Sequence, residues 1–153
     1  MKPAATADTG TVLAFDFGTR RIGVAVGNTL VRVAHPLTTI ADEANAARFA
    51  AVASLIDEWQ PAVLVVGRPV HADGKAHEMT ARAERFARQL EGRFGLPVAQ
   101  VDERLTTVDA EAALVAAGVG AKQRKALRDQ AAAQRILQSW FDDEQMDDVR
   151  GTA

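Results

Sequence analysis

The amino-acid sequence predicts an α/β fold in which a mixed five-stranded sheet is flanked by helices, and three observations carry this prediction. Short apolar runs of the kind that buried strands have occur at residues 11–17 (TVLAFDF) and 62–67 (AVLVVG). Between them, at 42–59, apolar residues recur at helical spacing. The chain of 153 residues, 48% hydrophobic and 25% charged, has the size and composition of one globular domain.

The first three strands are expected to be joined by short antiparallel connections. Residues 11–17 are followed at 21–27 by RIGVAVG, in which one face carries only glycine and alanine. The segment 18–20 between them is short enough for a hairpin turn. Residues 31–40 predict a third strand, and the proline at position 36 favours an edge position for it.

The rest of the chain alternates helices and strands, which predicts crossovers that return to parallel strands. The expected segments are a helix at 42–59, a strand at 62–67, a helix ending at Gly92 or Gly95, a strand at 96–101, a helix ending at Gly118 and a last helix at 122–141. Asp42 is the expected N-cap of the first helix. The order is therefore β-β-β-α-β-α-β-α-α, with helices on both faces of the sheet.

One domain is expected at residues 11–141, between a flexible N-terminus at 1–10 and an acidic flexible tail at 142–153. The tail carries five acidic residues, so the remaining body is mildly basic although the net charge is −2. A basic body is compatible with a nucleic-acid partner. The absence of cysteine excludes disulfides and thiolate-bound zinc. Without a signal peptide or an apolar stretch of about 20 residues, the expected location is the cytoplasm.

Three acidic positions are the candidate functional residues. Asp16 lies at the end of an apolar strand, where a carboxylate either binds a partner or cation or caps the following turn. Asp102 and Glu103 follow the fifth strand, and only one of them can share a site with Asp16 because successive side chains point to opposite faces. Asp129 falls in the apolar stripe of the last helix, unless that stripe reaches solvent beyond the sheet.

Carboxylate ligands without cysteine favour a hard cation, Mg²⁺ or Mn²⁺. A pair of such ions can hydrolyse a phosphodiester, because one lowers the pKa of the attacking water and the other stabilises the leaving oxygen. Basic residues near the acidic positions are candidate nucleic-acid contacts, and each could equally be a solvated surface charge. They are Arg20, Arg21, Arg68, Arg104, Lys122, Arg124, Lys125 and Arg128.

Four motifs cover nearly the whole chain: LAFDFGTRRIGVAVG at 13–27, VVGRP at 65–69 with a DG loop after it, DERLTT at 102–107, and DQAAAQRILQSW at 129–140. Together they resemble the YqgF, or RuvX, family. That family is known for Holliday junction resolvases and for nucleases of the 5′ end of pre-16S ribosomal RNA. The resemblance therefore implies a ribonuclease-H-like fold and a nuclease.

The resemblance also carries over three catalytic, metal-ligating residues: Asp16 from the first motif, Glu103 from the DER motif and Asp129 from the last helix. It selects Glu103 over Asp102. The family often has a lysine after the helix aspartate, whereas this chain has Gln130. That change removes a positive charge beside the expected site but no metal ligand.

The resulting prediction is a metal-dependent endonuclease that hydrolyses phosphodiester bonds at the 5′ end of pre-16S ribosomal RNA during ribosome biogenesis. A Holliday-junction-resolvase-like DNA nuclease is the alternative, and symmetric cutting of two strands would require a dimer. The sequence has no obvious dimer seam, so a monomer or weak homodimer is expected.

Two other classes of protein share parts of this pattern. A non-catalytic ribosome-assembly or transcription-associated binding module is disfavoured because all three carboxylates are present. The DFGTR sequence also resembles the phosphate-binding hairpin of actin-like and sugar-kinase phosphotransferases. Those proteins need two domains and a cleft between them, and 153 residues are too few for that arrangement.

Overall fold

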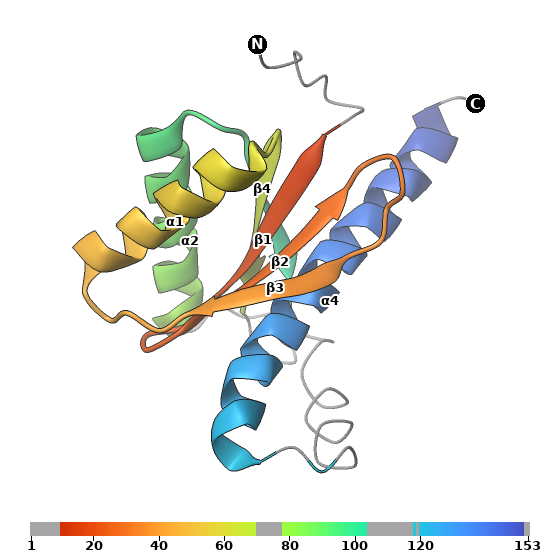
Figure 1. Cartoon of the computed structure of the whole chain (residues 1–153). Coiled ribbons are helices and arrows are strands. Elements are labelled where there is room, and N and C mark those ends of the chain that lie inside the picture. Colours follow the sequence, from red (N-terminus) through yellow and green to blue (C-terminus); the bar gives the residue numbers. More distant parts are fainter. Residues whose placement is uncertain (1–9, 70–77, 104–117, 119, 152–153) are drawn as a thin grey trace.

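A five-stranded mixed sheet with helices on both faces forms the centre of the protein (Figure 1). The computed structural model describes residues 10–69, 78–103, 118 and 120–151. The elements in this part of the chain are β1 (Thr11–Phe17), β2 (Ile22–Asn28), β3 (His35–Ile40), α1 (Asn45–Trp59), β4 (Val63–Arg68), α2 (Glu78–Phe94), β5 (Val98–Asp102) and α4 (Ala121–Gly151).

The strand order is β3-β2-β1-β4-β5. β1 pairs antiparallel with β2, and β2 pairs antiparallel with β3. On the other side, β1 pairs parallel with β4, and β4 pairs parallel with β5. The mixed five-stranded α/β sheet that the sequence predicts is thereby confirmed, including the edge position of β3.

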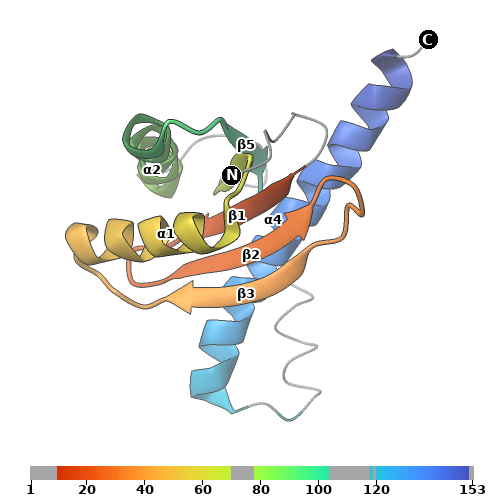
Figure 2. The ribbon, with the colours of Figure 1, turned by 45° about the horizontal axis from the view of Figure 1, so that its top comes forward.

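The two faces of the sheet are covered by different helices, as Figure 2 shows. α1 and α2 pack on the face that carries Leu13 and Phe15 of β1. α4 crosses the other face, on Val12 and Ala14. Because side chains alternate along a strand, Asp16 belongs to the α4 face and its neighbour Phe17 to the α1–α2 face.

α4 comes close to the sheet because β2 presents glycines to it. A Cβ atom added to Gly23 would lie 1.9 Å from the carbonyl oxygen of Asp129, and one added to Gly27 would lie 2.6 Å from the Phe141 ring. The small-residue face that the sequence shows in this strand is therefore the surface on which α4 packs.

Two glutamines of α4 hold the chain that leads into the edge strand. The Gln134 amide Nε2 donates to the Ala34 carbonyl oxygen at 3.0 Å, and the Ala34 N–H donates to Gln138 Oε1 at 3.0 Å. Gln138 Nε2 also donates to the Arg32 carbonyl oxygen at 3.0 Å. These bonds satisfy backbone groups beside the sheet edge, where water would otherwise have to serve as the partner.

The predicted N-cap of α1 is wrong. The helix begins at Asn45, and its N-cap is Ala44, which makes no side-chain hydrogen bond. Asp42 instead offers its backbone carbonyl oxygen to Arg48 Nε at 2.7 Å. A contact with a buried arginine of the same helix therefore replaces the expected capping bond.

Most element bounds differ from the predictions by one or two residues, and two others differ by more. The strand predicted at 31–40 begins only at His35, because residues 29–31 form a turn in which the Leu30 N–H donates to Asn28 Oδ1 at 2.7 Å. The last helix, predicted at 122–141, runs from Ala121 to Gly151. Residues 142–150 contain neither proline nor glycine, so the local sequence has no residue that stops a helix there.

The predicted division into a domain at 11–141 and two flexible ends stays a prediction. Residues 1–9 and most of the helix expected before Gly118 lie outside the described residues. Within the described part of the chain, none of the helices has the length and apolarity that crossing a bilayer requires.

The close contact at Gly23 predicts that Gly23→Ala destabilises the protein. The added methyl group would collide with the α4 backbone and cost about 1–3 kcal/mol of unfolding free energy, as overpacking usually does. Gly92→Ala is the matched control, because Gly92 lies inside α2 with nothing within 4 Å of an added Cβ. It should stabilise the protein by about 0.5–1 kcal/mol. Urea unfolding of both variants checks this, and equal midpoints would contradict the close packing of α4.

Candidate active site

Asp16 and Glu103 approach each other on the α4 face although their strands are not neighbours. Asp16 lies near the end of β1, Glu103 directly follows β5, and β4 runs between them. At this level β4 contributes Gly67, and a Cβ atom there would lie 2.6 Å from the Glu103 carboxyl carbon. The glycine therefore leaves the space through which the Glu103 side chain reaches Asp16. The two carboxyl groups share a hydrogen bond.

Burial changes the protonation of this pair. Loss of hydration, followed by the hydrogen bond and the charge of Asp16, raises the pKa of Glu103 to about 10. Burial also raises the pKa of Asp16; the hydrogen bond from Glu103 opposes that shift and the Asp129 charge adds to it. At neutral pH, and without a cation, Glu103 therefore keeps its proton and shares it with Asp16 through this hydrogen bond.

Asp129 completes the group from α4. Its backbone lies against Gly23, the residue that pairs with Asp16 across β1 and β2. Its carboxylate oxygen Oδ2 accepts a hydrogen bond from Arg21 Nε at 2.6 Å, with the Asp129 side chain 15% exposed. The structure thus brings the three carboxylates that the sequence singles out to one place, and Asp102 belongs to the opposite face of β5.

The chemistry of these side chains fits a hard divalent cation, which prefers carboxylate oxygen ligands. Asp16 and Glu103 are bridged by a proton, whose place a cation could take. Arg21 fixes the orientation of Asp129 beside them. In the arrangement described, no group of three acidic, histidine or cysteine side chains among the described residues is already spaced to hold an ion. A cation would therefore have to displace the proton and draw the carboxylates together.

The predicted basic residues do not all lie beside the carboxylates. Arg21 contacts Asp129 directly, and Arg128 of α4 is near enough to lower the pKa of Asp16. Arg20 is exposed in the turn between β1 and β2. Arg124 is half-buried near the start of α4.

Arg68 points away from the carboxylates. It ends β4 on the α1–α2 face, where its Nε lies 3.5 Å from Glu84 Oε1 of α2. Its role as a nucleic-acid contact stays a prediction. Arg104 and the side chains of Lys122 and Lys125 lie outside the described residues.

Three residues shape this region without being predicted as site residues. Gly67 gives Glu103 its space, and a lone glycine in a strand is a signal of such close approach. Arg48 is only 4% exposed, and its position four residues before Val52, on the apolar stripe of α1, is the signal that could have identified it. Gln130 donates from Nε2 to Thr39 Oγ1 at 3.1 Å, so it ties α4 to β3.

The fold and the carboxylate group define a protein of the ribonuclease-H-like class. Among solved structures the chain is similar to RuvC of Thermus thermophilus, at 17% identity and a TM-score of 0.50 over 86% of this chain and 93% of that one. It is also similar to the Fowlpox virus resolvase solved with Holliday junction DNA, at 10% identity and a TM-score of 0.56 over 87% and 97%. At these identities the likeness shows the fold alone, and it confirms the predicted fold class.

The chain belongs to the RuvX family, whose model, described as Holliday junction resolvase, matches residues 10–143. A relative from Nitrosomonas europaea with the name "Putative pre-16S rRNA nuclease" is 56% identical over 142 residues, which are 93% of this chain and 96% of the relative. One of the same name from Dechloromonas aromatica is 59% identical over 133 residues, 87% of this chain and 91% of the relative. The predicted family and the predicted class, a hydrolase of phosphodiester bonds, are confirmed.

The raised pKa of Glu103 predicts a pH-dependent stability in the presence of EDTA. Below pH 4.5 the group is protonated in both the folded and the unfolded chain, so it has no effect. Between 4.5 and about 10 only the unfolded chain ionises, so the free energy of unfolding should fall as the pH rises. Glu103→Gln, which stays neutral, should make this decline shallower and should be more stable than wild type at pH 8.

The matched control for this prediction is Glu91→Gln, at an exposed position of α2. It should keep the wild-type pH dependence in urea unfolding between pH 5 and 9. Parallel pH profiles for wild type and Glu103→Gln would contradict the buried, protonated state of Glu103.

Proposed function

We propose that this protein is a metal-dependent endonuclease that cuts precursor ribosomal RNA at the 5′ end of pre-16S rRNA, with Asp16, Glu103 and Asp129 as catalytic, metal-ligating residues. The observation that carries the proposal is the hydrogen-bonded Asp16–Glu103 pair, buried beside Asp129. Buried acidic groups with shifted pKa values are typical of functional sites. The names of the relatives support the choice of RNA.

The residues of the candidate active site have distinct parts in the proposed reaction. Asp16 and Glu103 would hold the metal after Glu103 loses its proton, and Arg21 keeps the Asp129 carboxylate oriented through its 2.6 Å bond. Arg128 offers positive charge to the phosphodiester on the same face. A bound pair of Mg²⁺ or Mn²⁺ ions would supply a lowered pKa for the attacking water and charge stabilisation for the leaving oxygen. An enzyme of ribosomal RNA processing would work in the cytoplasm.

A DNA nuclease that resolves Holliday junctions is the second candidate, and the description of the family model favours it. That function would need two copies of the chain, because two strands are cut symmetrically. RNA processing needs a single cut, which a monomer or weak homodimer can make. A purely nucleic-acid-binding module is less well supported. Two buried carboxyl groups lower the stability of the fold, and nucleic-acid binding alone does not require them.

Asp16→Asn and Asp129→Asn should each abolish metal-dependent cleavage. The test uses an RNA that spans a precursor 5′ end and, separately, a four-way DNA junction, with Mn²⁺ or Mg²⁺ and with EDTA. Loss of a ligand should slow cleavage by at least about a hundredfold, comparable to removing one group that stabilises the transition state. Asp142→Asn is the matched control, because Asp142 is an exposed aspartate of the same helix.

The outcomes of this experiment separate the candidates. Cleavage of the RNA that EDTA and both site variants abolish, with Asp142→Asn at the wild-type rate, supports the proposal. Cleavage of the junction alone would assign the DNA function instead. Binding of RNA without cleavage, equal in wild type and variants, would leave a binding module.

A further inference from the structure

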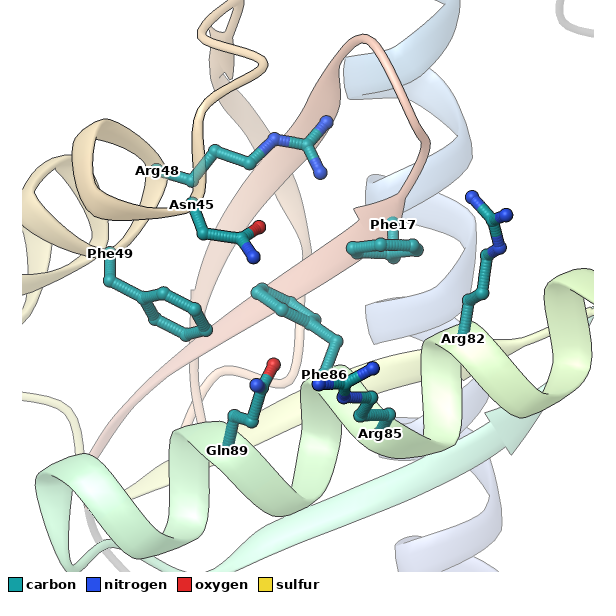
Figure 3. Close-up of a pocket in the computed structure, with 8 residues that line it drawn as sticks. All are labelled: Phe17, Asn45, Arg48, Phe49, Arg82, Arg85, Phe86 and Gln89. Carbon is teal, nitrogen blue, oxygen red and sulfur yellow. The ribbon is translucent and has the colours of Figure 1, made fainter.

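A pocket of about 270 Å³ lies on the face of the sheet opposite to the three carboxylates (Figure 3). Its walls are the first turn of α1, the middle of α2 and the end of β1. Figure 3 shows Phe17, at the end of β1, between the side chains that come from the two helices. The proposed chemistry on the α4 face makes no use of this pocket.

The described residues that line the pocket include three arginines, Arg48, Arg82 and Arg85, and no acidic residue. Arg48 is held in place by donating from Nε to the Asp42 carbonyl oxygen at 2.7 Å and from Nη2 to the Gly18 carbonyl oxygen. Arg82 and Arg85 are exposed on α2, and Arg82 also contacts Glu78 of the same helix. The pocket therefore presents an anion with the exposed guanidinium groups of Arg82 and Arg85, and with the charge of the buried Arg48 beside them.

The N-terminus of α1 adds a further positive feature. Asn45, the first residue of the helix, lines the pocket, and the N-cap before it is an alanine, which has no side-chain acceptor for the first N–H groups. There is also no acidic residue in the first turn. The backbone N–H groups and the helix dipole at this end favour a phosphate.

Aromatic rings form the floor of the pocket. The Phe17 and Phe86 ring centroids are 5.0 Å apart, and those of Phe49 and Phe86 are 5.8 Å apart. The Arg48 guanidinium lies 5.3 Å from the centroid of the Phe17 ring. Aromatic rings beside arginines are the surface on which bases of single-stranded nucleic acid stack while their phosphates are bound.

The pocket and the carboxylates lie at the same end of β1. Phe17 follows Asp16 directly, so their side chains point to opposite faces of one strand. The turn between β1 and β2 joins the two faces at this end of the sheet, and it carries the exposed Arg20. The same turn offers the Gly18 carbonyl oxygen to Arg48. A nucleic-acid strand that rounds this turn would therefore meet positive charge along its path.

We propose that this pocket binds one unpaired nucleotide of single-stranded RNA beside the cleavage site. Arg82, Arg85 and the N-terminus of α1 bind its phosphate beside the buried charge of Arg48, and its base lies against Phe17, the half-buried ring of the floor. We expect the base to be unpaired, because extruding a paired base from its helix costs the free energy of its pairing and stacking. That the bound strand is RNA rests on the proposed function. The test of the pocket measures binding and requires no cleavage.

The test compares two arginines of α2 that lie one turn apart. Arg85 lines the pocket, whereas Arg88 is also exposed and does not line it. Affinity for a short labelled single-stranded RNA is measured by fluorescence anisotropy in EDTA at several salt concentrations. Arg85→Gln should weaken binding about tenfold, as expected for the loss of a charged hydrogen bond. It should also reduce the salt slope by about 0.7, the value for one phosphate contact on a single strand. Arg88→Gln should bind RNA as wild type does.

Competition with adenosine monophosphate and with inorganic phosphate identifies the ligand. The nucleotide should displace RNA from wild type better than phosphate does, because only the nucleotide has a base. If Arg85→Gln and Arg88→Gln bind RNA equally well, the pocket proposal is overturned. If Arg85→Gln loses adenosine monophosphate but keeps RNA, the pocket takes a free nucleotide and the strand is excluded. A wild-type protein that cuts no RNA, yet binds it through Arg85, would refute the nuclease function and leave this pocket standing.

Discussion

The carboxyl groups of Asp16 and Glu103 lie buried side by side beneath α4. Several features of the fold hold the two groups in this position. Burial of a carboxyl group costs free energy that a hydrogen bond only partly offsets. Gly67 leaves the space for Glu103, and Gly23 allows the α4 backbone to bring Asp129 close. An arrangement that costs stability and requires glycines at two strands is what we expect if the pair holds a cation in place of the shared proton, as proposed above.

The sheet separates two kinds of chemistry. On the α4 face, small residues of β2 let the helix approach and the acidic group forms at the end of β1. On the other face, the aromatic and aliphatic core beneath α1 and α2 ends in an arginine-lined pocket at that same end. The alternation of Asp16 and Phe17 along one strand is the reason that acidic and basic surfaces lie back to back. Under the two proposals, one nucleic-acid substrate would use both sides of the sheet, the acidic side through a metal and the pocket through its phosphates.

Sequence periodicity predicts the sheet and the burial of two of the three candidate carboxylates. The apolar strand around Asp16 and the helical stripe around Asp129 predict burial without any knowledge of the tertiary structure. Periodicity could not choose between Asp102 and Glu103, because the face of β5 that meets α4 is decided by the sheet order; there the family resemblance made the choice. Capping also failed, since Asp42 uses its backbone carbonyl for Arg48 rather than its side chain for the helix. From the sequence alone, the pocket arginines of α2 are expected to be solvated surface charges. Their place in a pocket becomes visible only in the structure, where α1 lies opposite them.

The central claim is that Asp16 and Glu103 jointly bind a divalent cation, and crystals grown with Mn²⁺ would test it most directly. An anomalous difference map collected on such crystals locates manganese without any assumption about activity. We expect a peak bonded to carboxylate oxygens of both Asp16 and Glu103, with the hydrogen bond between them broken. A map with no peak there, and with the two carboxyl groups still hydrogen-bonded to each other, would contradict it.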